Sequence, residues 1–406
     1  MKMNSNEYKL PALNLLQPTA ASINSTQSNE DLTAKARLIQ ETLVPFDIRV
    51  SVGDITQGPS FTRYELHPAP GVKLERFLEL KNNLLAALKV EHLQILAPIP
   101  GKSTVGIEVP NAIKTKVVMR DLFESDEWRD SKAIVPIALG KDVYKRPVIA
   151  DLAKLPHLLI AGQSGSDKSV CLNVIITSLL YCFTPEQLRF MMIDSNVVEL
   201  QQFNILPHLA SPIVTDPKSA LPTLHGVMKE IEKRLQIFAR AKVRNIEAFN
   251  KRSKPLPRRD DDAPVVPEKL SYLVVVITEL ADLMEIAPSE TEMVIARITR
   301  MACAAGIHCI IATRQPSVDV LTSVIKSNIP ARIAFSVGSR ADSRTILDTH
   351  DAYNLLGNGD MLFAPSNSET RFRFQGASVT DQELQSIVDF ISQQKNLTAN
   401  QTSHIA

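Results

Sequence analysis

The chain has 406 residues, of which 44% are hydrophobic and 22% are charged. This composition excludes an intrinsically disordered chain and allows full cores in two or three domains. Lys and Arg total 45 against 44 for Asp and Glu, so no overall positive field attracts a polyanion, and any nucleic-acid-binding surface must be local.

Cysteine usage and hydropathy limit the chain further. The cysteines lie in apolar stretches without the paired spacing of a zinc site, so we predict buried, reduced thiols at Cys171, Cys182, Cys303 and Cys309. No apolar run reaches the length of about 18 residues that a membrane span needs, and the start MKMNSNEYK lacks the apolar segment of a signal peptide. We therefore expect a cytoplasmic chain without a membrane segment.

The first third of the chain predicts an arm followed by a small domain. Residues 1–34 are rich in Asn, Ser, Thr, Gln and Pro, which predicts a flexible arm. Residues 31–44 have helical spacing, residues 44–70 alternate like paired strands, residues 76–90 are helical, and residues 93–100 and 104–111 look like two more strands. We assign residues 35–125 to a small α+β domain.

A second pattern, which begins near Ile134, predicts an α/β domain over 126–394. Short apolar runs alternate with amphipathic helices; the runs cover 157–162, 189–194, 273–278, 307–313 and 332–337. Runs that are apolar at consecutive positions are typical of strands buried on both faces, so we predict a mostly parallel sheet whose ligand sits at the carboxyl ends of the strands. The Pro-rich, charged segment 251–269 is predicted to be a solvated loop insert, and 395–406 a polar tail.

The first apolar run leads into a candidate phosphate-binding loop. Gly162 opens it, and Lys168 and Ser169 stand where a lysine reaches the β/γ-phosphates of ATP and a hydroxyl reaches magnesium. We predict that this cofactor is bound by Gly162, Gln163, Ser164, Gly165, Ser166, Asp167, Lys168 and Ser169. The alternative is an ordinary strand-turn-helix connection with a chance glycine and lysine.

Asp167 stands where such a loop normally has its second glycine. Its side chain can crowd the phosphates, and its carboxylate repels them. At ~5 Å and an effective dielectric of about 20, one like-charge pair costs roughly 3 kcal/mol, on the order of a hundredfold in affinity. An ion pair between Asp167 and Lys168 would offset part of this repulsion, but the paired lysine would then be less available to the γ-phosphate.

The run LVVVITEL is the candidate partner strand, whose end should carry an Asp for magnesium and then a Glu that activates water. Glu279 is present as the candidate catalytic carboxylate, but Thr278 replaces the Asp. We assign magnesium to Ser169 and Thr278, although a threonine hydroxyl brings no charge to hold the ion. We expect the loss of this Asp alone to lower the rate of ATP hydrolysis by orders of magnitude.

Several blocks in unbroken order resemble the motor domain of the FtsK/SpoIIIE family of DNA translocases. They are LLIAGQSGSDKSV, FTPEQLRFMMID, LPHLASPIVTDPKSA, VRNIEAFN, ELADLM, AAGIHCIIATRQPSVDVLTSVIKSNIPARIAF, SRTILD and LLGNGDML. Upstream, TRYELHPAPGVK and APIPGKSTVGIEVPN resemble the small domain that precedes that motor. The resemblance covers roughly residues 35–390.

The resemblance implies a RecA-like sheet, ATP and Mg²⁺ bound between subunits, and a ring, typically a hexamer, around double-stranded DNA in chromosome segregation and cell division. Arg314, Arg332, Arg340 and Arg344 are candidates to reach a neighbouring subunit's phosphate, and Arg314 is the one assigned a catalytic role; the alternative is that each is solvated or paired with a carboxylate. Gln315 is the candidate catalytic sensor of the γ-phosphate, although its exchanged order with Arg314 leaves its direction open.

The departures from the family pattern cluster near the chemistry. Besides Asp167 and Thr278, the chain has Asp194-Ser195-Asn196 where Asp-Pro-Lys is usual, and Arg314-Gln315 where Gln-Arg is usual. Cys303 replaces an arginine, and His350-Asp351 replaces a glycine pair. His157, His208 and His308 lie beside predicted strands without metal-ligand spacing, which favours satisfied buried histidines.

One basic segment could contact DNA phosphates without reading sequence. The candidate residues are Arg240, Lys242, Arg244, Lys251 and Arg252. A charged helix face exposed to solvent explains them equally well.

Three functions remain open from sequence. The first is an ATP-driven duplex DNA translocase, and the second is a homologue with impaired ATP binding and hydrolysis that forms a homo-hexamer or a mixed ring with a paralogue. The third is a nucleotide-binding module that binds ATP without hydrolysing it. The losses at 167 and 278 favour the second.

Overall fold

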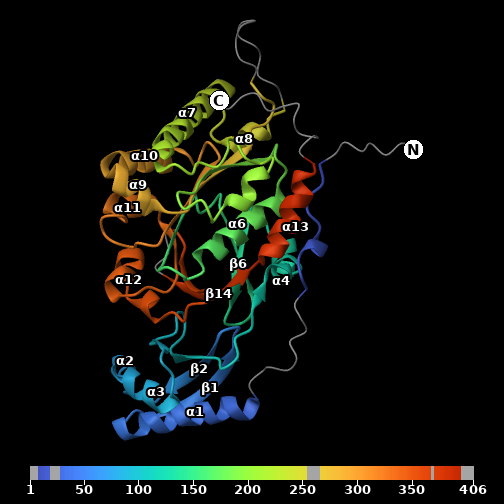
Figure 1. Cartoon of the computed structure of the whole chain (residues 1–406). Helices are drawn as coiled ribbons and strands as arrows, with labels where there is room; N and C mark the ends of the chain where they lie inside the picture. Colours follow the sequence, from blue (N-terminus) through green and yellow to red (C-terminus); the bar gives the residue numbers. More distant parts are fainter. Residues whose placement is uncertain (1–7, 19–27, 254–265, 367–369, 395–406) are drawn as a thin grey trace, which may run out of the picture.

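A computed structural model describes residues 8–18, 28–253, 266–366 and 370–394. It shows two domains, each with its own sheet, and the smaller domain lies at one end of the larger (Figure 1). Most of the predicted insert and the predicted polar tail lie outside these described residues. No helix in the described part of the chain is long and apolar enough to span a membrane.

The smaller domain is an antiparallel sheet covered by helices. Its strand order is β1-β2-β4-β3. The strands are β1 (Val50–Gln57), β2 (Phe61–Pro68), β3 (Gln94–Leu96) and β4 (Val105–Pro110), and the helices are α1 (Asn29–Leu43), α2 (Glu75–Glu79) and α3 (Lys81–Leu88). Helix α1 begins where the Ser28 hydroxyl accepts the Asp31 N–H. Ile39, Tyr64 and Phe77 are fully buried between these layers.

The larger sheet has the order β7-β6-β14-β13-β12-β8-β11-β10-β9, with β5 added beside β14. Strands β9, β10, β11, β8 and β12 are parallel, and β13, β14, β6 and β7 extend them antiparallel. The bounds are β5 (Val117–Val118), β6 (Pro136–Asp142), β7 (Pro147–Asp151), β8 (His157–Ala161), β9 (Leu188–Ile193), β10 (Tyr272–Ile277), β11 (Ile307–Thr313), β12 (Ala331–Ala334), β13 (Asp360–Ala364) and β14 (Phe372–Ser378). The predicted α/β class with a smaller α+β domain before it is confirmed, and the sheet is mixed because its parallel part carries this extension.

Helices cover both faces of the larger sheet. Helices α6 (Lys168–Cys182) and α13 (Asp381–Ser392) pack on one face; α7 (Pro217–Ala241), α9 (Leu280–Ile286), α10 (Pro288–Met301), α11 (Ser323–Asn328) and α12 (Arg340–Leu347) pack on the other. The short helices α4 (Met119–Phe123), α5 (Asp126–Arg129) and α8 (Ile246–Asn250) lie at the edges. Along β8, Leu158 and Ile160 face the first core, and Leu159 and Ala161 face the second. This burial on both faces is why the strand is apolar at every position from Leu158 to Ala161.

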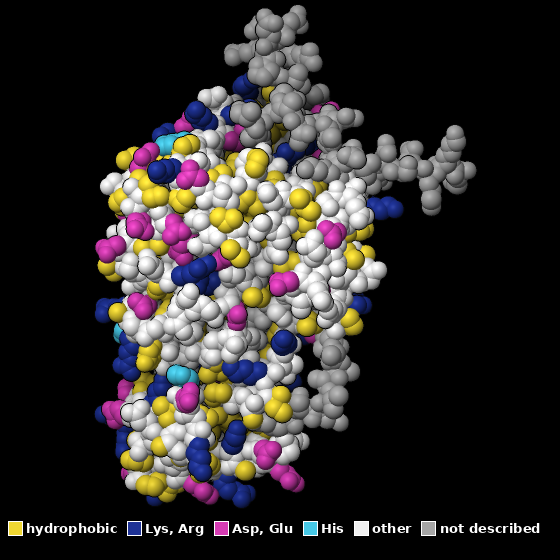
Figure 2. Space-filling view, in the orientation of Figure 1, with side chains coloured by type: hydrophobic (Ala, Val, Ile, Leu, Met, Phe, Trp, Pro, Cys, Tyr) yellow, Lys and Arg dark blue, Asp and Glu magenta, His cyan; other side chains and the backbone are white. Residues whose placement is uncertain are grey.

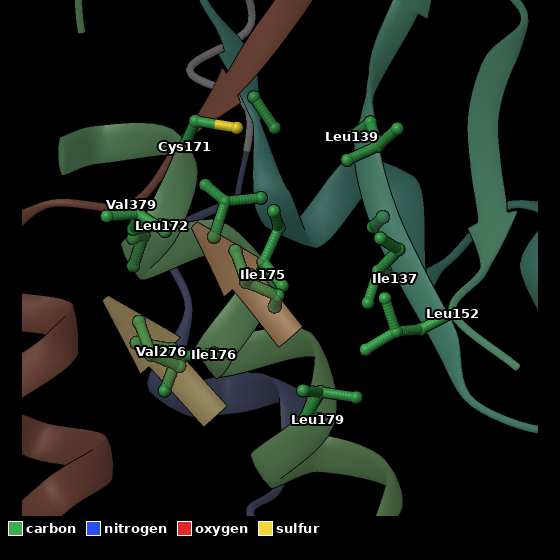
Figure 3. Close-up of a cluster of buried hydrophobic side chains, with 14 of the residues drawn as sticks. Ile137, Leu139, Leu152, Cys171, Leu172, Ile175, Ile176, Leu179, Val276 and Val379 are labelled. Carbon is green, nitrogen blue, oxygen red and sulfur yellow. The ribbon is translucent and has the colours of Figure 1, made fainter. Parts of the chain in front are cut away.

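Helix α6 is buried along most of its length. Leu172, Ile175, Ile176 and Leu179 pack toward strand residues such as Ile137 (Figure 3). Each such side chain contributes about 1.5–3 kcal/mol by leaving water. The helix that follows the candidate loop is therefore held rigidly by the core.

A buried ionic network joins the two domains. The Arg373 guanidinium lies 2.6 Å from carboxylate oxygens of both Glu108 and Asp360, and it stacks over the Phe61 ring at 4.3 Å. Glu108 also pairs with Arg63 at 2.6 Å. Because Glu108 lies on β4 and Arg373 on β14, this network ties the small domain to the large one.

The predicted domain limits differ from the packing at two places. Residues 8–18, expected in a flexible arm, lie against the large domain: Leu16 is buried in its core, and the Gln17 N–H donates to Glu383 of α13 at 2.7 Å. Helix α4, expected in the small domain, packs into the same core through Leu122 and Phe123. Isolated apolar residues in a polar segment gave no periodic signal for either contact.

The cysteines and histidines agree with expectation only in part: two cysteines are not buried, and the buried nitrogens His208 Nδ1 and His308 Nε2 have no hydrogen-bond partner among the described residues. Cys171 and Cys309 are buried, but Cys182 is half-buried and Cys303 is exposed, because Cys303 lies in the turn after α10. All three candidate histidines are buried and bond to main-chain groups: His157 to Thr299 O and Cys309 N, His208 to Phe183 O, and His308 to Pro156 O. Burial lowers the pKa of His157 to about 3 and the pKa values of His208 and His308 to about 4.

Candidate nucleotide site

Residues 162–167 form the turn that joins β8 to α6, at the carboxyl edge of the parallel strands. A Cβ on Gly162 would lie 2.6 Å from Phe335 Cβ and 2.8 Å from Ser166 Oγ, so this position requires glycine. Gly165 has φ +76° and Asp167 has φ 65°, the left-handed region that favours glycine. Asp167 therefore has the backbone conformation of the glycine that it replaces, and burial raises the pKa of its carboxyl group.

Lys168 is folded back onto the loop. Its Nζ donates to the carbonyl oxygens of Gly162 and Gln163, each at 2.7 Å. Burial lowers the pKa of this ammonium group to about 8, while nearby Glu279 acts to raise it. No ion pair with Asp167 occurs among the described contacts of Lys168, so the offset considered from sequence is not seen here. Two of the three N–H donors of the ammonium group are thus engaged by the loop, and the third makes only a 3.4 Å contact with Ser166 Oγ.

Thr278 turns toward a neighbouring strand end. Its Oγ1 donates to Asp194 Oδ1 at 2.9 Å, and the Leu200 N–H donates to Asp194 Oδ2 at 2.9 Å. The pairing follows from register, because Ile277 of β10 lies opposite Ile193 of β9. Asp194 is 1% exposed, and both of its oxygens are engaged.

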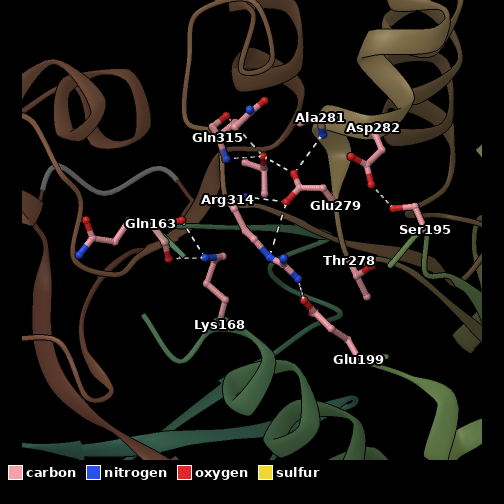
Figure 4. A network of polar contacts seen from close by, with 12 residues as sticks. Gln163, Lys168, Ser195, Glu199, Thr278, Glu279, Ala281, Asp282, Arg314 and Gln315 are labelled. Atoms are coloured by element: carbon pink, nitrogen blue, oxygen red, sulfur yellow. Dashed lines mark hydrogen bonds and ion pairs between the residues drawn. The ribbon is translucent and has the colours of Figure 1, made fainter. Parts of the chain in front are cut away.

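Glu279 is enclosed by donors from its own chain (Figure 4). Its Oε1 accepts from Thr313 Oγ1 at 2.6 Å and from the Ala281 N–H at 3.1 Å, and its Oε2 accepts from the Arg314 N–H at 2.9 Å. The Arg314 Nε also lies 4.0 Å from Oε2, and the other end of the guanidinium pairs with Glu199. Arg314 thus bridges two carboxylates beside Lys168.

These residues fit phosphate better than magnesium. A magnesium ion is usually held by one or two carboxylates together with substrate phosphates. Here the Thr278 hydroxyl bonds to Asp194, Glu279 is surrounded by donors, and the described residues contain no cluster of three His, Cys, Asp or Glu that could hold a metal. Of the two predicted magnesium ligands, only Ser169, half-buried in the first turn of α6, has a hydroxyl without such a bond among the described contacts.

The remaining arginine and glutamine candidates divide into engaged and exposed groups. Arg332 bonds to Ile346 O at 2.9 Å and to Asp348 at 2.8 Å, so it is a structural residue within this chain. Arg340 and Arg344 are exposed on α12. The Gln315 N–H donates to Thr313 Oγ1 at 3.1 Å, and its side chain is exposed near Glu279.

The predicted DNA-binding segment lies away from the candidate loop. Arg234 of α7 donates to Ser271 O and Ala305 O, which precede β10 and β11, so the end of α7 lies at the amino edge of the parallel strands. Arg240, Lys242, Arg244 and Lys251 are exposed there. Arg252 is instead anchored on Phe249 O and Glu268 O and over the Phe249 ring. On the face in Figure 2, basic and acidic side chains are intermixed, so that face has no broad basic surface.

Sequence reasoning did not assign Glu199 or Asp194 to the site. Both follow β9, whose carboxyl end meets the same sheet edge as the candidate loop. Their position after β9 was the signal that could have placed them at the site. Their pairing with Arg314 and Thr278 could not be read from sequence, because these partners come from distant segments.

The loop between β8 and α6, set in this sheet, defines a P-loop ATPase fold. Two solved structures share it: the pCW3 conjugation coupling protein TcpA, described as a monomer with ATPγS, and the cytoplasmic domain of the type VII secretion ATPase EccC of Thermomonospora curvata. TcpA has a TM-score of 0.58 and 21% identity over 88% of this chain and 99% of its own. EccC has a TM-score of 0.57 and 21% identity over 68% of this chain and 34% of its own.

The chain belongs to the FtsK/SpoIIIE family. The FtsK/SpoIIIE family model matches residues 118–318, and the FtsK alpha domain model matches residues 10–111. The DNA translocase FtsK of Caldanaerobacter subterraneus subsp. tengcongensis is 46% identical over 393 residues, 97% of this chain and 54% of the relative. The DNA translocase SftA of Bacillus subtilis is 44% identical over 387 residues, 95% of this chain and 40% of the relative. The chain thus spans about half the length of these relatives.

Proposed function

We propose that this chain is a double-stranded-DNA-binding subunit of an FtsK-type ring whose own ATP hydrolysis is impaired. Family membership and relatives named DNA translocases support the DNA partner and the ring. The ring is a homo-hexamer or a mixed ring in which a paralogue supplies turnover. DNA contact is assigned to Arg240, Lys242, Arg244 and Lys251, with Arg252 as a structural support, and it is independent of sequence.

The observation that carries this proposal is the engagement of Glu279. A carboxylate that orients attacking water needs an oxygen free to accept from that water. Both Glu279 oxygens accept from Thr313, Ala281 or Arg314 instead. The Thr278 hydroxyl, which replaces the metal-orienting carboxylate, is directed to Asp194. The strand end therefore has no metal-orienting carboxylate at position 278, and the glutamate at position 279 is occupied by bonds from its own chain.

DNA-stimulated ATPase measurements test the proposal. We expect the wild-type chain to match the Lys168→Ala variant, which reports background. The double variant Asp167→Gly with Thr278→Asp should exceed background at least about tenfold, since it restores the loop glycine and the metal-side carboxylate. DNA-stimulated wild-type turnover well above Lys168→Ala would refute impaired hydrolysis.

Retention of Lys168, Ser169 and Glu279 favours the second candidate, an active ATP-dependent DNA translocase. In that case nucleotide would have to displace Arg314 from Glu279 and bind Lys168 through the donor that contacts Ser166 Oγ at 3.4 Å. Displacement of the third strand from a DNA triplex by the wild-type chain, dependent on ATP and abolished by Lys168→Ala, would establish this function. A chain that binds DNA without ATP-dependent movement supports the first proposal.

A further inference from the structure

Arg314 is placed beside the phosphate loop of its own chain. Thr313 of β11 lies opposite Ala161 of β8, so Arg314 follows at the level of Gly162, where the loop begins. Arg314 influences the ionisation of Lys168, as do Glu199 and Glu279. Figure 4 shows the guanidinium between Lys168 and the two glutamates. This sheet edge therefore presents two cations that could meet one phosphate chain.

Both cations are satisfied by oxygens that a phosphate can replace. Lys168 bonds to two loop carbonyls, and Arg314 pairs with Glu199 through a side chain that is 35% exposed. A guanidinium binds phosphate in the same two-pronged geometry as carboxylate. Ligand phosphate can thus take the place of Glu199 without moving Arg314 far from its present position.

We propose that this site binds the polyphosphate of a nucleotide without magnesium, with the Arg314 guanidinium in place of the metal ion. The inference rests on the proposed impaired nucleotide site and goes beyond it by defining the ligand as metal-free nucleotide. Magnesium strengthens nucleotide binding only where the protein site binds the nucleotide-bound metal ion more favourably than water does. Here the strand end offers a threonine bonded to Asp194 and a glutamate already paired with a cation. Arg314 also repels a dication.

Calorimetric binding of ATPγS in excess magnesium and in EDTA tests the inference. For wild type, the apparent Kd should be at least about tenfold weaker in excess magnesium than in EDTA, because magnesium complexes ATPγS and leaves only a small fraction of it metal-free. Arg314→Gln should weaken binding in EDTA at least about tenfold, because one of the two cations is lost. Arg297→Gln removes a matched arginine from an exposed pair with Glu232 at 2.8 Å and should leave both values unchanged. Thr278→Asp should make magnesium favourable.

The outcomes separate this inference from the proposed function. Wild-type binding that is as tight in excess magnesium as in EDTA, or tighter, overturns the metal-free site, and so does an absence of binding in both buffers. Either result, in a chain without ATPase activity, leaves impaired hydrolysis standing. Conversely, DNA-stimulated turnover together with tighter binding in EDTA refutes impaired hydrolysis and supports metal-free binding.

Discussion

Replacing Asp167 by asparagine should tighten nucleotide binding about a hundredfold. The carboxylate is carried by the loop that encloses phosphate oxygens, and its backbone has φ 65°. At ~5 Å and an effective dielectric of about 20, removing one like-charge pair is worth roughly 3 kcal/mol. Asparagine keeps the size of the side chain and tolerates the left-handed region, so this variant isolates the charge. Asp167→Gly also removes the side chain and its backbone strain, which adds about 1 kcal/mol to loop stability.

Titration calorimetry with ATPγS in EDTA measures all three chains without a metal ion. Equal Kd values for wild type and Asp167→Asn would refute the electrostatic reasoning, whereas a gain confined to Asp167→Gly would show that crowding dominates. Because burial raises the pKa of Asp167, acidification toward its pKa neutralises the carboxylate. The affinity advantage of Asp167→Asn over wild type should therefore shrink as pH falls.

Three further perturbations have defined outcomes. Arg373→Met leaves Asp360 as an uncompensated buried charge and Glu108 with Arg63 as its remaining cation, so urea unfolding should show a loss of about 3–5 kcal/mol; a loss under about 1 kcal/mol would contradict a structural role for the network. The three buried histidines are neutral in the fold with pKa values of about 3 to 4, so the unfolded state binds more protons below its pKa of about 6.5. Their stabilisation is complete above about pH 6.5 and should fall by roughly 2 kcal/mol per histidine at pH 5; unfolding free energies with the same pH slope in single histidine-to-glutamine variants would argue against it. Lys242→Ala with Arg244→Ala should weaken duplex binding and lower the salt slope by about two, whereas Arg129→Ala in α5 should not; unchanged binding by the double variant would place DNA elsewhere.

The continuous apolar runs in the sequence were sufficient to predict the parallel strands, because each of these strands is buried on both faces. The predicted run 273–278 corresponds to β10 at Tyr272–Ile277, and 307–313 corresponds to β11 with the same bounds. The loop after β8 was identifiable because glycine at 162 and a lysine six positions later are required by geometry. The φ of 65° at Asp167 gives the physical reason why a glycine was expected there.

The contacts inside the site could not be predicted from spacing. Glu199 follows an irregular segment, and its pairing with Arg314 depends on how the loop after β9 folds beside β11. The bonds from Lys168 to Gly162 and Gln163 are local, but a lysine can also extend, and only the surrounding charges and burial decide between the two. The packing of residues 8–18 was not predicted because it depends on a few apolar side chains in a polar segment. Leu16 is buried in the core of the large domain, and Leu13 and Leu15 pack against that core.

The changes at positions 278 and 196 are physically linked. The family resemblance implies an Asp at 278 and a Lys at 196, on the ends of adjacent strands, where this chain has Thr278 and Asn196. A second carboxylate at 278 would lie about 3 Å from Asp194, a distance at which two like charges cannot both remain ionised without a cation. Thr278 removes the conflict by donating to Asp194, and a cation at 196 then has no second carboxylate to neutralise. The buried amide nitrogen of Asn196 is left without a partner, which is the expected consequence when a longer, charged side chain is lost from a polar position. An aspartate restored at 278 therefore needs a cation beside Asp194, which either a bound magnesium ion or a lysine at 196 would supply.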